Sequence, residues 1–180
     1  MSIEVVPWSP RWAEEFEEVA AELRVALIHV ASARVEHVGS TSVPGLAAKP
    51  VLDIDVVVDG PDTEAAIDAL ESIGYLHRGD LGVTGREAFS APDSEPRRNV
   101  YVCLTGTLAL RTHLAVRDVL RRRDDLRDEY AATKRMLAAQ PGMDMPSYVA
   151  GKSMVLQRVL EESDLSEQER LAVLLLKGGA

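Results

Sequence analysis

Apolar residues recur along the chain with two different spacings. From 12 to 27 they return every third or fourth position, and many of the positions between them are glutamates. This spacing predicts an amphipathic helix with the apolar stripe Trp12, Phe16, Val19, Leu23 and Leu27. The run 51–58 is instead apolar and β-branched apart from two aspartates, and Pro50 and Gly60 bound it. Such a run predicts a buried strand.

The rest of the chain alternates between the same two patterns. Short apolar runs predict further strands at 35–38, 75–77 and 99–104, and the glycine-rich segment 79–89 predicts a loop. Helical spacing returns at 62–73, from 107 to 123, at 124–139, at 147–162 and at 167–177. We therefore expect an α/β (α+β) fold with a small mixed sheet, flanking helices and a helical C-terminal half. We divide the chain into a main domain at 1–163 and an apolar C-terminal helix at 164–180.

Two aspartates interrupt the buried strand. Asp53 and Asp55 are two residues apart, so they point to one face, with Cα atoms roughly 6–7 Å apart. Two carboxylates are costly to bury without a counter-charge. Mg²⁺ would remove their repulsion, since it takes one or two carboxylates and completes its shell with phosphate and water oxygens. Gly39 and Ser40, which turn the chain before this strand, would offer backbone N–H groups and a hydroxyl to phosphates.

A second interpretation of these residues stays open. Asp55 can be a strand residue that pairs with a basic side chain, and Ser40 can be a helix cap. His37, near the end of the preceding strand, is expected to be a hydrogen-bonded structural histidine rather than a metal ligand.

The stretch that contains these residues is similar to known families. Gly-Ser followed about a dozen residues later by Asp-x-Asp on a strand resembles the nucleotidyltransferase superfamily. The longer pattern H-x-G-S-T-S-V-P-G-L-x-A-K-P, from His37 to Pro50, resembles the GrpB family, which is nucleotidyltransferase-like, and further matches run from Trp8 to about Val159. The resemblance implies a nucleotidyltransferase-like sheet with Asp53 and Asp55 as catalytic metal ligands. It also implies Mg²⁺ or Mn²⁺ as the cofactor and transfer of a nucleoside monophosphate from a nucleoside triphosphate to an unknown acceptor. The expected partner is a nucleoside triphosphate or another small phosphorylated ligand.

Phosphate contacts are expected from seven residues: Gly39, Ser40, Thr41, Lys49, Arg86, Arg111 and Arg117. Lys49 could neutralise a phosphate or pair with an acidic side chain. The resemblance brings in the arginines, through a Gly-Arg before an aromatic residue at 85–89 and the segment RTHLAVRD at 111–118. A guanidinium can hold phosphate oxygens through two bonds at once. For Arg86, a solvated loop position is an equally open interpretation.

Lysines of the helical half offer a further source of positive charge. Lys134 and Lys152 each follow a tyrosine by four residues, as in the family pattern Y-x-x-x-K, and could reach the cleft from that side.

The strand at 99–104 departs from the pattern of active nucleotidyltransferases, which usually place a third carboxylate there. The run NVYVCL has none, and Tyr101 stands where GrpB proteins often have histidine. A neutral phenol is a poor Mg²⁺ ligand. The alternative function is therefore a catalytically inactive nucleotide- or partner-binding module with the same fold.

Composition limits the functions and locations that we expect for this protein. The chain has 180 residues and a net charge of −9, so general nucleic-acid binding is not expected. Its single cysteine, Cys103, excludes a disulfide framework. No apolar run reaches the roughly 18 residues that span a bilayer, and no signal peptide is recognised, so we expect a cytoplasmic protein without membrane contact. The apolar last helix must be buried on this domain or on a second copy, which makes a homo-oligomer an expectation.

Overall fold

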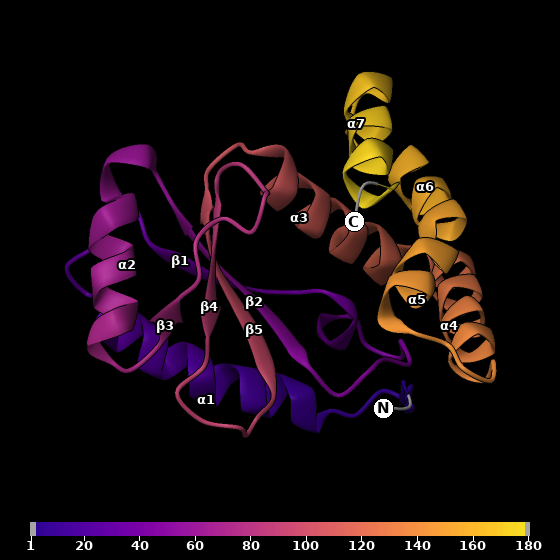
Figure 1. The fold of residues 1–180 in the computed structure, drawn as a ribbon, viewed down its shortest axis with the longest axis horizontal. Coiled ribbons are helices and arrows are strands. Elements are labelled where there is room, and N and C mark those ends of the chain that lie inside the picture. Colours follow the sequence, from indigo (N-terminus) through magenta and orange to yellow (C-terminus); the bar gives the residue numbers. More distant parts are fainter. Residues whose placement is uncertain (1–2, 179–180) are drawn as a thin grey trace.

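The fold was obtained as a computed structural model and is described for residues 3–178, with side chains described up to residue 174. A five-stranded mixed sheet forms its centre, with strand order β1-β2-β5-β4-β3 (Figure 1). The strands are β1 (Arg34–Val38), β2 (Leu52–Val58), β3 (Leu76–His77), β4 (Arg86–Ser90) and β5 (Arg98–Leu104). β2 pairs with β5 in parallel, and the other pairs are antiparallel. The α/β sheet with flanking helices is thus confirmed.

One face of the sheet forms the main core. Because side chains alternate along a strand, Leu52, Ile54, Val56 and Val58 all point to this face. There they pack against α1 (Arg11–Ala26) and α2 (Thr63–Ser72), and the expected stripe from Trp12 to Leu27 is buried. Figure 1 shows these two helices on the side of the sheet away from the helical half. The opposite face of β2 is therefore the one that carries Asp53 and Asp55.

The helical C-terminal half covers part of that opposite face. It consists of α3 (Leu108–Arg122), α4 (Asp124–Ala138), α5 (Met145–Gly151), α6 (Ser153–Glu161) and α7 (Glu167–Gly178). Its core is formed with residues of the segment after β1, which contains the short 3-10 helix η1 (Ser40–Ser42). Val43, Leu46 and Ala47 of this segment are buried against α3, α4 and α6. The helices thus pack directly on the turn that follows β1.

The last helix packs on its own chain. Val173 is buried with Leu160 and Leu165, and Ser166 with Glu169 forms the expected capping box. Leu171 and Leu174 are exposed, and the side chains of Leu175 and Leu176 lie outside the described residues. A homo-oligomer through this helix remains a prediction.

Two elements differ from the sequence-based expectation. The segment 79–89 was expected to be a loop, but its end forms β4, because Arg86 to Phe89 pair with β5. The single helix expected at 147–162 is two helices, with Lys152 between α5 and α6. At this break the backbone of Gly151 approaches Leu137 of α4 closely, and a Cβ on residue 151 would lie 2.6 Å from Leu137 Cδ2.

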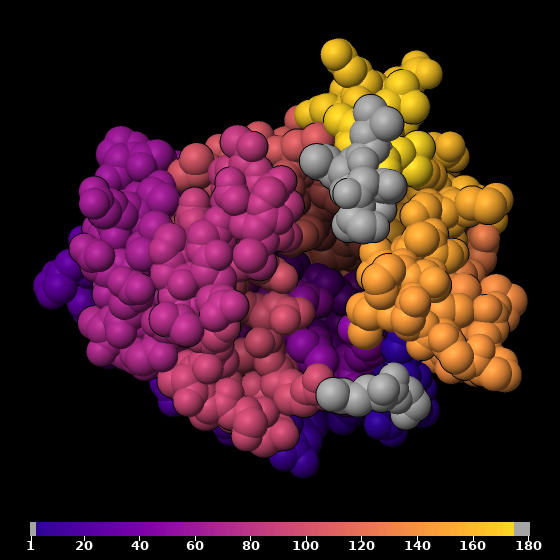
Figure 2. All heavy atoms as spheres, viewed as in Figure 1, coloured from indigo at the N-terminus to yellow at the C-terminus, as the bar shows by residue number. Residues whose placement is uncertain are grey.

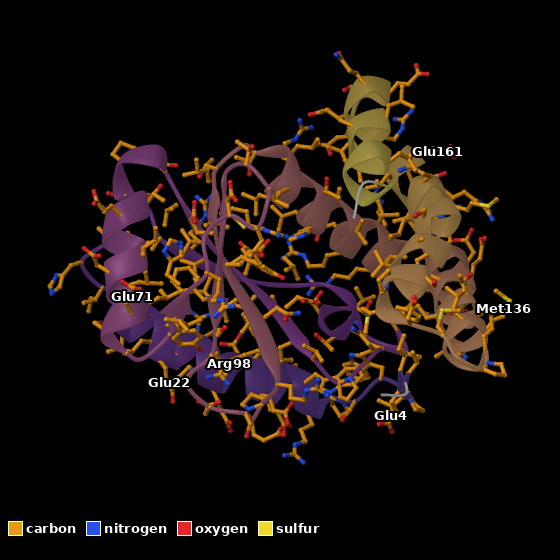
Figure 3. The ribbon with its side chains drawn as sticks, in the orientation of Figure 1. Glu4, Glu22, Glu71, Arg98, Met136 and Glu161 are labelled. Atoms are coloured by element: carbon orange, nitrogen blue, oxygen red, sulfur yellow. The ribbon has the colours of Figure 1, made fainter. Side chains whose placement is uncertain are left out.

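The outer surface of the helical half is partly apolar. Met136, on α4, is 59% exposed and points away from the sheet (Figure 3).

Between residues 3 and 178, none of the helices combines the length and the apolar character that crossing a membrane requires.

Candidate functional site

Asp55 is held inside the protein, facing α3. Its side chain is completely buried, and its Oδ2 lies 2.8 Å from His113 Nδ1. Its Oδ1 is also buried and has no hydrogen-bond partner of ordinary strength, since the thiol of Cys103 is only a weak donor. One oxygen of this carboxylate is therefore fixed by an imidazole, and the other is left as an unused acceptor.

Asp53 lies one step along the same face, at the floor of a cleft. Asn99 of the neighbouring strand donates a hydrogen bond of 2.8 Å to Asp53 Oδ1. Burial raises the pKa of Asp53, while the Asn99 bond and the nearby His113 act in the opposite direction. The negative charge of Asp55 adds to the rise. A positive ligand close to both carboxylates would stabilise the ionised form of Asp53 and lower its pKa.

The turn after β1 touches Asp53 directly. Gly39 has φ +69° and ψ −171°, a backbone conformation that is essentially restricted to glycine. A Cβ at this position would lie 2.2 Å from Asp53 Oδ2. Only glycine therefore lets the turn approach the carboxylate this closely, and the turn's backbone borders the cleft.

Ser40, the next residue, is joined to the helical half. Lys134 Nζ of α4 donates a hydrogen bond of 2.9 Å to Ser40 Oγ, and Tyr130 is a further hydrogen-bond partner of Ser40. Lys134 is only 2% exposed. Burial lowers the pKa of Lys134 to about 7, with Lys152 and Arg135 lowering it further. Ser40 thus contacts an ammonium group whose charge is already destabilised.

A cleft of about 290 Å³ unites these groups. Gly39, Ser40, Asp53, Asn99 and Tyr101 line it from the sheet side, and His113, Tyr130, Lys134, Tyr148 and Lys152 line it from the helices. Lys49 borders it as well, next to the ring of Tyr148. Figure 2 shows a hollow between the sheet half, in magenta and pink, and the orange helical half. The carboxylate of Asp53 therefore lies on one wall of the cleft and lysines lie on the other, whereas Asp55 is completely buried and does not line the cleft.

Two of the arginines expected to bind phosphate are not brought into the cleft. Arg111 forms an ion pair with Glu169 of α7. Arg117 Nη1 binds Glu36 at 2.8 Å and the carbonyl oxygen of His37 at 3.2 Å. Both guanidinium groups are engaged by acceptors of the protein that lie far away in the sequence, which is why the local pattern did not reveal their positions.

The other expected residues fall at different distances from the cleft. Gly39, Ser40, Lys49 and Asp53 line it, whereas Thr41 is buried beside it and its Oγ1 lies 3.0 Å from His37 Nε2. Arg86 does not line it but lies over the ring of Tyr101, which does, with the guanidinium carbon 4.4 Å from the ring centroid.

The two lysines that were expected to be able to reach the cleft from the helical half line it, although neither was counted among the seven phosphate-binding residues. Lys134 and Lys152 provide the positive charge that the arginines were expected to provide, and Tyr130 and Tyr148 lie beside them. The repeated Tyr-x-x-x-Lys spacing was the sequence signal for this pair. Asn99 and His113, which contact the two aspartates, had no local signal of that strength.

The donor set fits one divalent cation better than two. Within residues 3–178, no group of three or more His, Cys, Asp or Glu side chains is placed to hold a metal ion. Asp53 and Asp55 lie on the same face, and Asp55 Oδ1 is an unused acceptor. Two carboxylates are enough for Mg²⁺ when phosphate and water oxygens complete the shell.

Comparison with known proteins places this cleft in a family. The family model described as GrpB protein matches residues 2–162. The chain belongs to the GrpB family. It is 36% identical over 165 residues to a UPF0157 protein of Halalkalibacterium halodurans, covering 91% of this chain and 83% of that relative. A crystal structure of conserved protein GrpB from Enterococcus faecalis superposes with a TM-score of 0.75 and 31% identity, covering 88% of this chain and 98% of that one.

More distant structures share only the fold. The Cid1 poly(U) polymerase with MgGTP bound matches with a TM-score of 0.51 and 17% identity, over 84% of this chain and 51% of that one. This GrpB protein therefore has a nucleotidyltransferase-like fold.

Proposed function

We propose that the cleft binds a nucleoside triphosphate with a divalent cation and transfers its nucleoside monophosphate to an acceptor hydroxyl. The observation that carries this proposal is the meeting of Asp53, the Gly39–Ser40 turn and Lys134 in one cleft. A triphosphate with its metal needs carboxylate oxygens on one side and cations with hydrogen-bond donors on the other. Asp53 lies on one wall of the cleft, and Lys134 and Lys152 lie on the other.

The lysines and the turn would bind the phosphates. Lys49, Lys134 and Lys152 line the cleft, and Ser40 presents its hydroxyl between the turn and Lys134. Backbone N–H groups of a tight turn can add hydrogen bonds to phosphate oxygens. These groups would hold the β- and γ-phosphates, which leave as pyrophosphate.

Asp53 and Asp55 would hold the cation. A bound Mg²⁺ would polarise the phosphoryl oxygen and lower the pKa of a coordinated hydroxyl. The side chains around it have separate roles. Asn99 fixes the orientation of Asp53, and His113 fixes that of Asp55. In the transfer, a bond forms between the acceptor oxygen and the α-phosphorus, and the bond from the α-phosphorus to the bridging oxygen of the β-phosphate breaks.

Thermal unfolding with ATP, GTP, CTP and UTP, each with and without Mg²⁺, tests binding. A nucleotide at about 100 times its dissociation constant should stabilise the protein by roughly 2.7 kcal/mol. The Mg²⁺-dependent part should vanish in Asp53→Asn and in Asp55→Asn. Asp68→Asn is the matched control, because Asp68 is an exposed aspartate on α2 at the opposite face. Equal shifts in all four proteins, or no shift with any nucleotide, would contradict the proposal.

A second candidate is a nucleotide-binding module without turnover. Tyr101 pairs with Asp55 across β5 and β2, where an active enzyme would have a carboxylate, and His113 engages one oxygen of Asp55. Release of pyrophosphate, or transfer of label from an α-labelled triphosphate, separates the two functions. A metal-dependent shift without any turnover would favour the binding module.

A further inference from the structure

Ser40 and Lys134 form a pair that phosphate binding alone does not require. Ser40 Oγ and Lys134 Nζ are 2.9 Å apart, a hydrogen-bond distance. The two residues are separated by 94 positions in the sequence, so the packing of α4 against the turn creates the pair. A lysine beside a serine is one of the arrangements that activate a hydroxyl for nucleophilic attack.

Ser40 and Lys134 differ in solvent exposure, as expected for a nucleophile and the base that activates it. Ser40 is partly exposed and lines the cleft, whereas Lys134 is 2% exposed beneath it. The two hydroxyls that follow in the chain are used elsewhere: Thr41 contacts His37, and Ser42 donates to the carbonyl oxygen of Gly39. Ser40 is therefore the hydroxyl of this turn that combines contact with a base and access to a ligand.

We propose that Ser40, activated by Lys134, accepts the terminal phosphoryl group of a nucleoside triphosphate bound in the cleft. The donor in this step rests on the proposed function, whereas the serine–lysine pair does not. In the step, the Ser40 Oγ–Pγ bond forms and the bond from Pγ to the bridging oxygen breaks. The nucleoside diphosphate leaves, and the hydroxyl proton passes to the neutral amine of Lys134.

The surroundings favour the product. A phosphoserine carries about −1.5 to −2 charge at neutral pH. Lys134 would be protonated after the step, and Lys49 and Lys152 line the same cleft. The phosphoryl group would occupy the space expected to hold nucleotide phosphates, so the modified protein should bind nucleotide less tightly.

The protonation state of Lys134 gives the reaction a characteristic pH dependence. Charged and titratable groups near Lys134 are Asp53 of β2, Lys152 after α5, and Tyr130 and Arg135 of α4. With a pKa of about 7, the neutral base is present above this pH, so the rate should rise with pH and level off near pH 8. At pH 6 it should be about tenfold below the plateau, since a base acts only in its deprotonated form.

The experiment measures intact mass and peptide maps of the full chain after incubation with Mg²⁺ and each of the four triphosphates. Acetyl phosphate serves as a second phosphoryl donor that contains no nucleotide. We expect one phosphoryl group per chain, on Ser40, and none in Ser40→Ala. Nucleotide binding is followed in the same samples by thermal unfolding, which also shows that each variant is folded.

Two substitutions of Lys134 test whether this residue acts as a base or only as a positive charge. Lys134→Arg keeps a positive charge but cannot act as a base, because arginine stays protonated. Lys134→Met removes both properties and provides a second variant if the arginine is not accommodated. Both should lose modification from either donor. Arg24→Gln removes an exposed charge on α1, away from Lys134, and should be modified at the wild-type rate.

The outcomes distinguish this proposal from the proposed function. If nucleotides stabilise the protein but neither donor modifies Ser40 between pH 6 and 9, the nucleophile is refuted and nucleotide binding stands. Modification of Lys134→Arg and Lys134→Met at the wild-type rate would also refute it. If acetyl phosphate modifies Ser40 in a Lys134-dependent way while no nucleotide binds, the result supports Ser40 as a nucleophile. It then refutes a nucleoside triphosphate as the phosphoryl donor.

Discussion

Replacing Gly39 with alanine should disrupt the site and the fold together. The backbone at Gly39 has φ +69° and ψ −171°, where a residue with a side chain costs roughly 1–3 kcal/mol. The new Cβ would also lie 2.2 Å from Asp53 Oδ2 and 2.9 Å from Asp53 Cβ and Cγ. Forcing atoms into such a space costs typically 1–3 kcal/mol. The two contributions add to about 2–6 kcal/mol, compared with a total stability of about 5–15 kcal/mol for most domains.

Urea unfolding measures this loss as a change in midpoint at constant slope. Gly106→Ala is the control for a Cβ at a positive φ without a clash, because Gly106 has φ +79° and no atom within 4 Å of its added Cβ. Gly39→Ala should therefore be more destabilising than Gly106→Ala. The difference should shrink when Asp53 is also replaced by alanine, since the two nearest carboxylate atoms are then gone. Residues in contact typically couple by 0.5–3 kcal/mol in such a cycle.

The same substitution should abolish the Mg²⁺-dependent stabilisation by nucleotide. Asp53 can avoid the new methyl group only by giving up its position beside Asn99, where it would hold the cation. Additive free energies for Gly39→Ala and Asp53→Ala would refute the reasoning. So would a Gly39→Ala protein with the stability of Gly106→Ala and an unchanged response to nucleotide and Mg²⁺.

Three further outcomes are expected. Burial first, and then Arg121 and Arg117, lower the pKa of His37 to about 4, so neutral His37 is the folded form. The contribution of neutral His37 to the free energy of unfolding should be complete above pH 6.5. It should fall by about 3 kcal/mol as the pH drops to 4, because each unit of pKa difference corresponds to about 1.36 kcal/mol. Urea unfolding of wild type and His37→Gln across this range measures how the free energy of unfolding changes with pH. Arg111→Gln should cost at most about 1 kcal/mol and leave nucleotide-induced thermal shifts unchanged, because its partner is Glu169 of α7. Tyr101→Asp should lower the melting temperature in EDTA and recover more stability in Mg²⁺ than the wild type does, because it adds a third carboxylate beside Asp55.

The parts of the site that the sequence predicted are the local ones. Two aspartates in an apolar strand must share a face, and Gly-Ser after a strand must turn, whatever the rest of the chain does. Asp53 and the Gly39–Ser40 turn are accordingly where the pattern placed them. The same holds for β2, whose observed range Leu52–Val58 lies within the predicted run.

The parts that it did not predict depend on distant partners. Arg111 and Arg117 have the charge for phosphate binding, but Glu169 and Glu36, at separations of 58 and 81 residues, occupy them. The Tyr-x-x-x-Lys pattern allowed Lys134 to reach the cleft, but its contact with Ser40 exists only because α4 packs on the turn. Periodicity defines the apolar face of a helix, but it does not reveal which cation on its edge will meet a ligand and which will meet a carboxylate.

The arginines of α3 acquire a different role from this arrangement. Arg117 donates to the carbonyl oxygen of His37, two residues before Gly39, and Arg121 donates twice to the carbonyl oxygen of Ser42, three residues after it. Guanidinium groups therefore hold the backbone on both sides of the strained turn, while Lys134 contacts its hydroxyl from α4. A glycine conformation that costs free energy persists only where the surrounding structure fixes it. The docking of the helical half is therefore what holds the turn against Asp53, so a substitution that loosens α3 from β1 should impair ligand binding without touching the ligand.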